Sequence, residues 1–342
     1  MKHPVASLLV CALLVACSSG SNPFTTPPEP AAEDPVVVVD PDAPPVVTEE
    51  TPITIPADIA GSVTSATYDA AAGTLTVEGV NLDEVPFSAV YTRAPALDQD
   101  GYTAFTVQED PLDRHFTAYA RESNDGTVRA TVVSSPGPRN RSFLGAHFER
   151  DGDYDPPEVT ETSGLVTYAG RYVGVVNGGS LTGGDLLPTT VTDPELLVSQ
   201  ALIIHGDTFL NADFADNRVE GNIYNRQILD TDLTVINDLP SLVLIVTDIE
   251  ANGTFSGNIE YDITDPLSNT TEFVQIGTYS GLFGGIDSVS VAGGVDLDEF
   301  DGVSNPLGYE NEFESGVFVL DQCGTPGDSA ICDNVNPDVG TP

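Results

Sequence analysis

The cysteine near the amino terminus is the residue whose chemistry is easiest to predict. Cys17 directly follows Leu14-Val15-Ala16, at the end of an apolar run that begins after Lys2. A small residue before a cysteine at the end of such a run is typical of a bacterial lipoprotein signal, in which the thiol carries the lipid. Cys11 follows the β-branched Val10 and suits a small cleavage pocket less well. The alternative is an ordinary secretory signal that is cut nearby, with Cys17 incidental.

Acyl chains on Cys17 would hold the protein firmly at a membrane, because each buried methylene contributes ~0.8 kcal/mol. The apolar run has about a dozen residues, too few to cross a hydrocarbon core of ~30 Å, and no other segment reaches ~18 apolar residues. Ser18 occupies the position where an aspartate would favour retention at the inner membrane. We therefore expect a protein that is anchored to the outer membrane and does not span it.

Two cysteines remain near the carboxyl terminus. Cys323 and Cys332 bracket a turn-rich segment, residues 324–331, after the last predicted strand. In an oxidising envelope compartment, two cysteines around such a loop favour a disulfide, which would hold the terminal residues near the end of the preceding fold. The alternative is free or metal-bound thiols, although the sequence nearby offers no third or fourth ligand.

Catalytic motifs are missing from the sequence. It contains no Gly-x-Ser-x-Gly, His-Glu-x-x-His or phosphate-binding glycine loop. His115, His147 and His205 each lie in or beside a predicted strand, and none has a second His or Cys at metal-ligand spacing. We interpret them as ordinary strand residues and predict no enzyme and no cofactor. An envelope hydrolase is the weakest alternative, since a chain this acidic always offers some carboxylate pair.

Two acidic clusters could be considered for calcium. In the first, Asp151, Asp153 and Asp155 alternate as in an EF-hand loop, but Pro156 replaces the required glycine and Thr162 the required glutamate. The second cluster consists of Asp296, Asp298, Glu299 and Asp301. Loop carboxylates at this density usually face water, so we predict no metal site at either place.

The charge balance excludes one class of partner. The chain has 53 acidic residues against 11 basic ones, for a net charge of −42, and its one lysine lies in the predicted signal. Such a surface repels phosphate backbones, so we predict no binding of nucleic acid. Acidic surfaces also keep proteins soluble, and this is the simplest reason for the composition.

The composition divides the chain into five segments. Residues 1–16 are the predicted signal, and residues 17–56 form an acidic linker whose prolines favour an extended tether on the order of 100 Å long. Residues 57–157 are predicted to form a small antiparallel β domain, residues 158–322 a β-barrel, and residues 323–342 a cysteine-bracketed tail. The fold class is therefore mainly β, in two antiparallel parts.

Alternating polar and apolar residues locate the strands. In the small domain, four runs alternate, at residues 74–79, 102–107, 116–121 and 127–133. In the barrel region we predict eight strands, at residues 165–176, 200–214, 218–227, 241–250, 253–263, 272–284, 288–297 and 315–320. Short turns between eight antiparallel strands favour an up-and-down barrel, which removes exposed edges.

Glycine- and aromatic-rich patches along residues 165–320 resemble the barrel lobe of the transferrin-binding protein B family of surface lipoproteins. The matching patches, in chain order, are YAGRY at 168–172, ADF at 212–214, VEG at 219–221, GTFSG at 253–257, GLFG at 281–284, VAGGV at 291–295 and GVF at 316–318. The resemblance implies a handle-like domain and a barrel that binds a macromolecule through its loops. It does not imply transferrin as the ligand, because ligands differ within the family.

Together these observations predict an outer-membrane lipoprotein, held in the lipid through acylated Cys17, that binds an unknown protein or solute as a monomer. Exposure at the cell surface is favoured over the periplasmic side. The alternative is a structural or adhesive envelope lipoprotein with no specific ligand. The disulfide would join Cys323 to Cys332.

Overall fold

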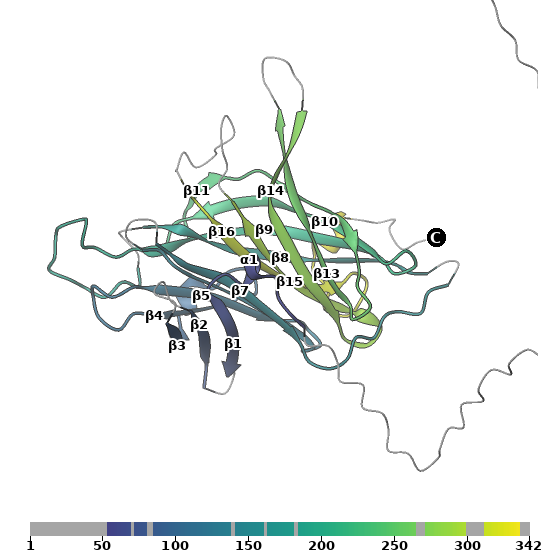
Figure 1. The fold of residues 1–342 in the computed structure, drawn as a ribbon, viewed down its shortest axis with the longest axis horizontal. Coiled ribbons are helices and arrows are strands. Elements are labelled where there is room, and N and C mark those ends of the chain that lie inside the picture. Colours follow the sequence, from purple (N-terminus) through teal and green to yellow (C-terminus); the bar gives the residue numbers. More distant parts are fainter. Residues whose placement is uncertain are drawn as a thin grey trace, which may run out of the picture. The chain divides into compact units, whose positions relative to one another are not determined.

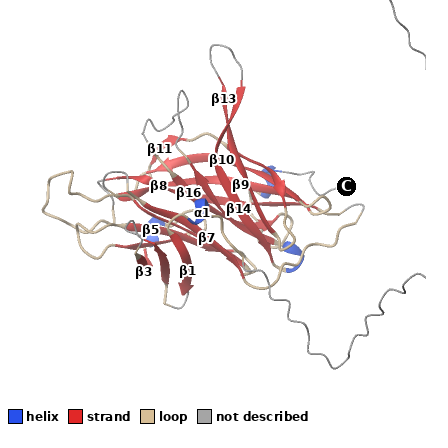
Figure 2. Cartoon of the chain, in the orientation of Figure 1, coloured by secondary structure: helices blue, strands red, loops and turns tan. Residues whose placement is uncertain are grey.

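The computed structural model describes residues 53–69, 72–80, 85–137, 141–160, 163–180, 184–264, 271–298 and 311–335. Strands dominate these residues and the helices are short, so the chain is mainly β as predicted (Figure 2). Several sequence-based predictions lie outside the described residues. They are Cys17, the signal peptide, the linker as far as residue 52, and Thr162, Glu299 and Asp301 of the acidic clusters.

Seven antiparallel strands form the N-terminal sheet, each paired with the next along the chain. They are β1 (Val63–Asp69), β2 (Thr74–Val80), β3 (Pro86–Arg93), β4 (Thr103–Val107), β5 (Phe116–Glu122), β6 (Val128–Ser135) and β7 (Phe143–Arg150). The sheet nearly closes on itself, because Ser62 before β1 donates its backbone N–H to Leu144 O of β7 at 2.8 Å. Aromatic and aliphatic side chains fill its concave face, among them Tyr91, Phe105 and Phe143.

The remaining strands form the predicted barrel. They are β8 (Leu165–Ser180), β9 (Gln200–Asp213), β10 (Arg218–Leu229), β11 (Val235–Asp238), β12 (Leu242–Asp248), β13 (Thr254–Thr264), β14 (Thr271–Gly284), β15 (Ser290–Leu297) and β16 (Glu314–Gln322). Apart from β11, each pairs with its sequence neighbour, and β16 pairs with β8 to close the ring. The up-and-down barrel of eight strands is therefore confirmed (Figure 1). The short β11, which the sequence analysis did not identify, adds to the end of β10.

The alternation that predicted β13 corresponds to the two faces of the barrel wall. Phe255, Ile259 and Tyr261 are buried in the barrel core, whereas Ser256 and Asn258 between them are exposed. Such a period of two places every second side chain on the same face of a strand. Aromatic rings provide much of the barrel core, and the Phe255 and Tyr279 rings lie 6.0 Å apart.

Residues 288–297 also alternate in sequence, but β15 is not half-buried as β13 is. All but one of its residues are buried, because the N-terminal sheet covers the face that points away from the barrel interior. Ala292 of β15 shares a core cluster with Ala146 and Phe148 of β7. At Gly294, a Cβ atom would lie 2.6 Å from Ile59 Cγ2, so only glycine leaves room for this contact. The two sheets therefore share a buried interface.

Short helical segments connect the strands. They are α1 (Ala57–Ala60), η1 (Pro95–Leu97), η3 (Ile286–Ser288) and α2 (Cys332–Val335). Asn217 and Gly253, in the turns before β10 and β13, both have positive φ, 53° and 77°, which asparagine and glycine tolerate best. Within the described ranges, no helix has both the length and the apolar character that membrane crossing requires.

Candidate functional site

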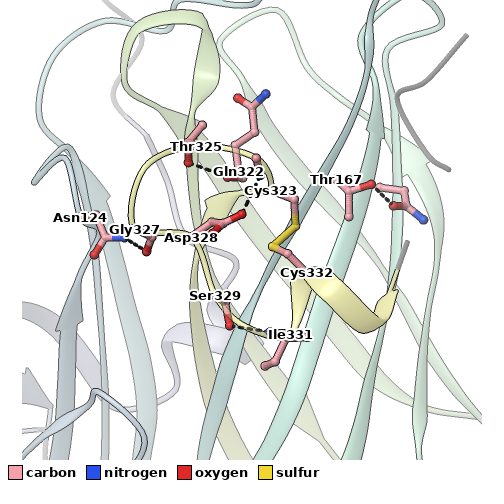
Figure 3. Close-up of a disulfide and its surroundings, with 12 residues drawn as sticks. Asn124, Thr167, Gln322, Cys323, Thr325, Gly327, Asp328, Ser329, Ile331 and Cys332 are labelled. Carbon is pink, nitrogen blue, oxygen red and sulfur yellow. Dashed lines mark hydrogen bonds between the residues drawn. A yellow bond between two sulfur atoms is a disulfide. The ribbon is translucent and has the colours of Figure 1, made fainter. Parts of the chain in front are cut away.

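The C-terminal cysteines are joined in the structure. Cys323 and Cys332 form a disulfide with their Cα atoms 5.5 Å apart, the pairing that their spacing predicts (Figure 3). The bridged loop is also tied to its surroundings, because Cys323 donates its backbone N–H to Thr167 O at 2.9 Å and Asn124 Nδ2 donates to Gly327 O at 2.7 Å. These contacts link the end of β16 to β8 and to the turn between β5 and β6.

A β-bulge in β10 turns two consecutive polar side chains to different sides of the barrel wall. The pairing of β10 with β9 shifts between Tyr224 and Gln227, and Asn225 within the shift has a φ of 50°. Before the bulge Ile223 faces the core, and after it Arg226 is buried while Asn225 is exposed. A bulge commonly redirects a side chain in this way. Here it brings a charged group into the barrel.

Arg226 meets a carboxylate inside the barrel. Its Nη2 donates to Glu314 Oε2 and its Nη1 donates to Pro240 O at 2.8 Å. The Tyr172 hydroxyl donates to the other oxygen, Glu314 Oε1, at 2.6 Å. Because charges removed from water need close partners of opposite sign and hydrogen bonds, this arrangement offsets the cost of burying both groups.

The tyrosine in this cluster has a fixed position and protonation state. Burial raises the pKa of Tyr172 well above its usual value, and the neighbouring Glu314 raises it further, so the hydroxyl stays protonated. A Cβ atom at Gly316 would lie 1.9 Å from Tyr172 Oη, and one at Gly174 would lie 3.0 Å away. The two glycines therefore make the space that the ring occupies.

Polar side chains at the bulge line a cleft of about 580 Å³ that β8, β9, β10 and β11 share. The Arg171 guanidinium on β8 pairs with Asp207 Oδ1 on β9. Asn225 Nδ2 donates to Asp207 Oδ2 at 2.9 Å, so each carboxylate oxygen has a donor. The Asp207 side chain is therefore held from two sides in the cleft wall, and it is only 14% exposed.

A second set of polar contacts continues along the same cleft. His205 Nδ1 lies 3.2 Å from Asp100 Oδ2, and His205 Nε2 lies 3.1 Å from Gln227 Oε1. Gln227 Nε2 donates to Asp238 Oδ1 at 2.7 Å, which leaves the amide oxygen to accept from the imidazole. The contacts connect the turn before β4 with β9, β10 and β11. The sequence analysis treated His205 as an ordinary strand residue, but it takes part in this polar network.

Two loops, one after β4 and one after β8, contact each other. The loop at 108–115 joins β4 to β5, and residues 184–199 belong to the loop between β8 and β9. Gln108 Oε1 accepts a hydrogen bond from Leu187 N at 2.7 Å, and Thr106 Oγ1 donates to Asp185 Oδ2. Three leucines of these loops are exposed, Leu112 by 46%, Leu187 by 38% and Leu196 by 59%. Both loops thus expose apolar side chains to solvent.

The other two histidines are enclosed. His115, directly before β5, is 1% exposed and burial lowers its pKa, although Asp185 at 3.5 Å opposes that shift. Burial likewise lowers the pKa of His147 in β7. Thr117 Oγ1 lies 3.4 Å from His115 Nδ1, but the threonine is fully buried and out of reach of a substrate.

The acidic clusters form no metal centre among the residues that the structure describes, where no three His, Cys, Asp or Glu side chains are placed to hold an ion. Asp151, Asp153 and Asp155 lie beside a shallow hollow next to Ile286. Burial, together with the Asp298 and Asp58 carboxylates, raises the pKa of Asp296 to about 7.

One signal for the cleft is present in the sequence of β10. The inward positions of β10 are odd-numbered at Val219 and Ile223 but even-numbered at Arg226 and Ile228. Because side chains alternate strictly along a regular strand, such a change of parity requires an extra residue, which is the bulge.

Comparison with known proteins gives similarity in structure only. No family model and no curated protein matches the sequence. The structure is similar to transferrin-binding protein B of Haemophilus parasuis, in a double-mutant form, at 12% identity and a TM-score of 0.35, over 73% of this chain and 51% of the other. The same protein from serogroup B Neisseria meningitidis matches at 13% identity and a TM-score of 0.30, over 76% of this chain and 52% of the other.

The N-lobe domain of lactoferrin-binding protein B of Moraxella bovis matches at 14% identity and a TM-score of 0.29, over 60% of this chain and 79% of the other. This chain therefore spans about half the length of the two transferrin-binding protein B chains. They belong to the family that residues 165–320 resemble in sequence. Similarity at these scores carries no information on the ligand.

Proposed function

We propose that the chain is an outer-membrane lipoprotein that binds a macromolecule or a solute. Cys17, at the end of the apolar run, is the proposed lipid attachment site. The proline-rich linker that follows would carry the folded part away from the lipid. In this proposal the protein faces the outside of the cell.

The surface of the two adjoining loops is the observation that carries the binding proposal. Gln108 holds the two loops together, because its amide oxygen accepts from Leu187 N at 2.7 Å and its amide nitrogen donates at 3.0 Å to the O atom of Asp113, which follows Leu112. Exposed apolar side chains that are held by such contacts are ready to bury area on a partner at little cost in ordering. Leu196 extends the surface along the second loop. A rigid barrel that presents adjoining loops suits recognition of a macromolecule.

A pull-down with matched variants tests this proposal. The mature full-length chain with a C-terminal tag is used to capture partners from intact cells and their surroundings. The test variant combines Leu112→Ser and Leu196→Ser. The control is Val246→Ser, since Val246 is 49% exposed on β12, a strand that neither loop adjoins in the chain.

We expect one stoichiometric partner that the wild type and the control retain and that the loop variant loses by about tenfold, as for a contact of several apolar side chains. Equal capture of diffuse envelope material by all three proteins would instead favour a structural or adhesive role. Protease treatment of intact cells then tests exposure, and survival of the barrel together with a periplasmic control would contradict display at the surface.

A further inference from the structure

We propose that the cleft formed by β8, β9, β10 and β11 binds a neutral, hydroxyl-rich oligosaccharide. This inference goes beyond the proposed function, because it depends neither on the lipid anchor nor on the surface of the two loops. It follows from the fixed polar groups of the cleft, the hydrogen bonds and ion pairs among them, and two aromatic rings beside it, one of them on Tyr224, which pairs with Asp207 across β10 and β9.

Planar polar side chains are held in fixed orientations in the cleft. Asp207 is anchored by Arg171 and by Asn225, and each of these two side chains has further N–H groups. Gln227 is held between His205 and Asp238. Adjacent hydroxyls of a sugar ring can each donate and accept a hydrogen bond, so they suit a row of carboxylate, amide and guanidinium groups that are already in position. Such preorganisation reduces the entropic cost of binding.

The charged groups of the cleft already have partners, although Asp238 accepts its hydrogen bond from the neutral amide of Gln227. The Arg171 guanidinium compensates Asp207, and His205 lies between Asp100 and Gln227. A charged ligand would have to displace one of these partners. In addition, the net charge of −42 on the whole chain disfavours the approach of anions. A neutral ligand can add hydrogen bonds to these groups without displacing their partners, and the net charge does not oppose its approach.

Aromatic rings lie next to these polar groups. The rings of Tyr224 and Phe209 are 6.2 Å apart at an angle of 63°, and both side chains are half-buried. Burial raises the pKa of Tyr224, Asp207 raises it further and Arg171 lowers it, so the phenol is close to this ion pair. A pyranose ring has an apolar C–H face as well as hydroxyls at its edge. An aromatic ring can pack against the C–H face while neighbouring planar polar groups form hydrogen bonds with the hydroxyls.

The backbone supports the same assignment. Asn225 adopts a φ of 50°, a conformation that is uncommon outside glycine, although asparagine tolerates it better than most other residues. Backbone outliers of this kind, like β-bulges, are concentrated at functional sites. The outlier at Asn225 places the amide against Asp207 at the edge of the cleft.

Binding to defined oligosaccharides tests the proposal. The probes are neutral malto-, cello- and chito-oligosaccharides, with oligogalacturonate as the anionic counterpart, measured against the mature full-length chain. Tyr224→Ala removes the ring. Asn225→Gly removes the amide and retains the freedom to adopt positive φ. The matched control is Phe273→Ala, because Phe273 is 66% exposed on β14.

We expect at least one neutral oligosaccharide to bind. Its affinity should fall about tenfold or more in Tyr224→Ala, fall several-fold in Asn225→Gly and stay unchanged in the control. If Tyr224→Ala does not fold, Asn225→Gly decides the outcome. The proposal is overturned if no neutral probe binds, if oligogalacturonate binds better, or if both cleft variants bind as the wild type does. Capture of a partner through the loops is a separate measurement. Failure of the oligosaccharide proposal therefore does not count against the proposed binding by the loops, and the reverse also holds.

Discussion

Arg226 of β10 and Glu314 of β16, 88 residues apart in the sequence, form an ion pair inside the barrel. The two strands are not hydrogen-bonded to each other, so the pair crosses the interior and connects opposite parts of the wall. Both side chains are almost completely buried, with exposures of 1% and 4%. The bulge at Asn225 makes this contact possible by turning Arg226 inward.

Removing one partner of this pair is predicted to be far more costly than removing both. Arg226→Met leaves the Glu314 carboxylate buried without its cation, and we expect the free energy of unfolding to fall by about 3–5 kcal/mol. The double variant Arg226→Met/Glu314→Gln should recover a large part of this loss. Urea denaturation of the four proteins of this mutant cycle provides the test.

Arg218→Met is the surface control, since Arg218 is 62% exposed and lies 3.9 Å from Asp248. It should change stability by less than about 1 kcal/mol. A loss in Arg226→Met as small as that of the control would contradict the role assigned to the buried pair.

The hydroxyl of Tyr91 is predicted to destabilise the N-terminal sheet. Tyr91 is fully buried, and its hydroxyl has no hydrogen-bond partner among the described residues. Burying an unsatisfied polar group is costly, so Tyr91→Phe should raise the free energy of unfolding by about 1 kcal/mol. Tyr119→Phe is the matched control, because the Tyr119 hydroxyl donates to Leu97 O at 3.1 Å and its removal should lower stability. Thermal denaturation that ranks the two variants in the opposite order would refute this prediction.

Asp296 is predicted to make stability depend on pH. Burial, together with the Asp298 and Asp58 carboxylates, raises the pKa of Asp296 from 3.8 to about 7. The folded state therefore binds a proton that the unfolded state has lost, so this contribution is complete below about pH 4 and disappears as the pH rises to 7. Asp296→Asn stays neutral at every pH. It should be more stable than the wild type above pH 7, on the order of 1 kcal/mol after screening by solvent, and the difference should vanish below pH 4.

Chemical denaturation between pH 4 and pH 8 checks the sign of this effect. Asp248→Asn is the control, because the Asp248 side chain is 83% exposed. A difference between Asp296→Asn and the wild type that does not vary with pH would show that the burial of Asp296 is not its cause.

The disulfide is predicted to stabilise the closed ring. It joins cysteines nine positions apart, at the end of the strand that closes the barrel. Cys323→Ser/Cys332→Ser should lower the free energy of unfolding by about 2–3 kcal/mol, the amount expected for a loop of this length. Reduction of the wild type should give the same change, and an unchanged melting temperature under reducing conditions would contradict it.

The barrel could be predicted from the sequence because one face of its wall is apolar and turns are short. Every predicted strand between residues 165 and 320 corresponds to a strand of the ring. In the N-terminal sheet, β1, β3 and β7 were not identified. The β1 sequence Val63–Asp69 consists largely of small and polar residues, and β7 is covered on both sides, so neither has the clean alternation of β13.

The cleft and the buried ion pair could not be predicted in the same way. They bring together residues from strands and turns whose register is set by the bulge in β10 and by the closure of β16 on β8. Asp100, for example, lies in the turn before β4 of the N-terminal sheet, whereas His205 lies on β9 of the barrel. Only the packing of one sheet on the other puts them within reach, and single-strand periodicity contains no information on that packing.

Attachment of lipid to Cys17 is the central claim, because the anchor distinguishes a membrane-held binding protein from a freely secreted one. The most direct measurement is incorporation of labelled palmitate into the full-length protein expressed in a bacterium with lipoprotein-processing enzymes. We predict label in the wild type and in Cys11→Ser, and none in Cys17→Ser. An unlabelled wild type, or label that persists in Cys17→Ser, would contradict the account.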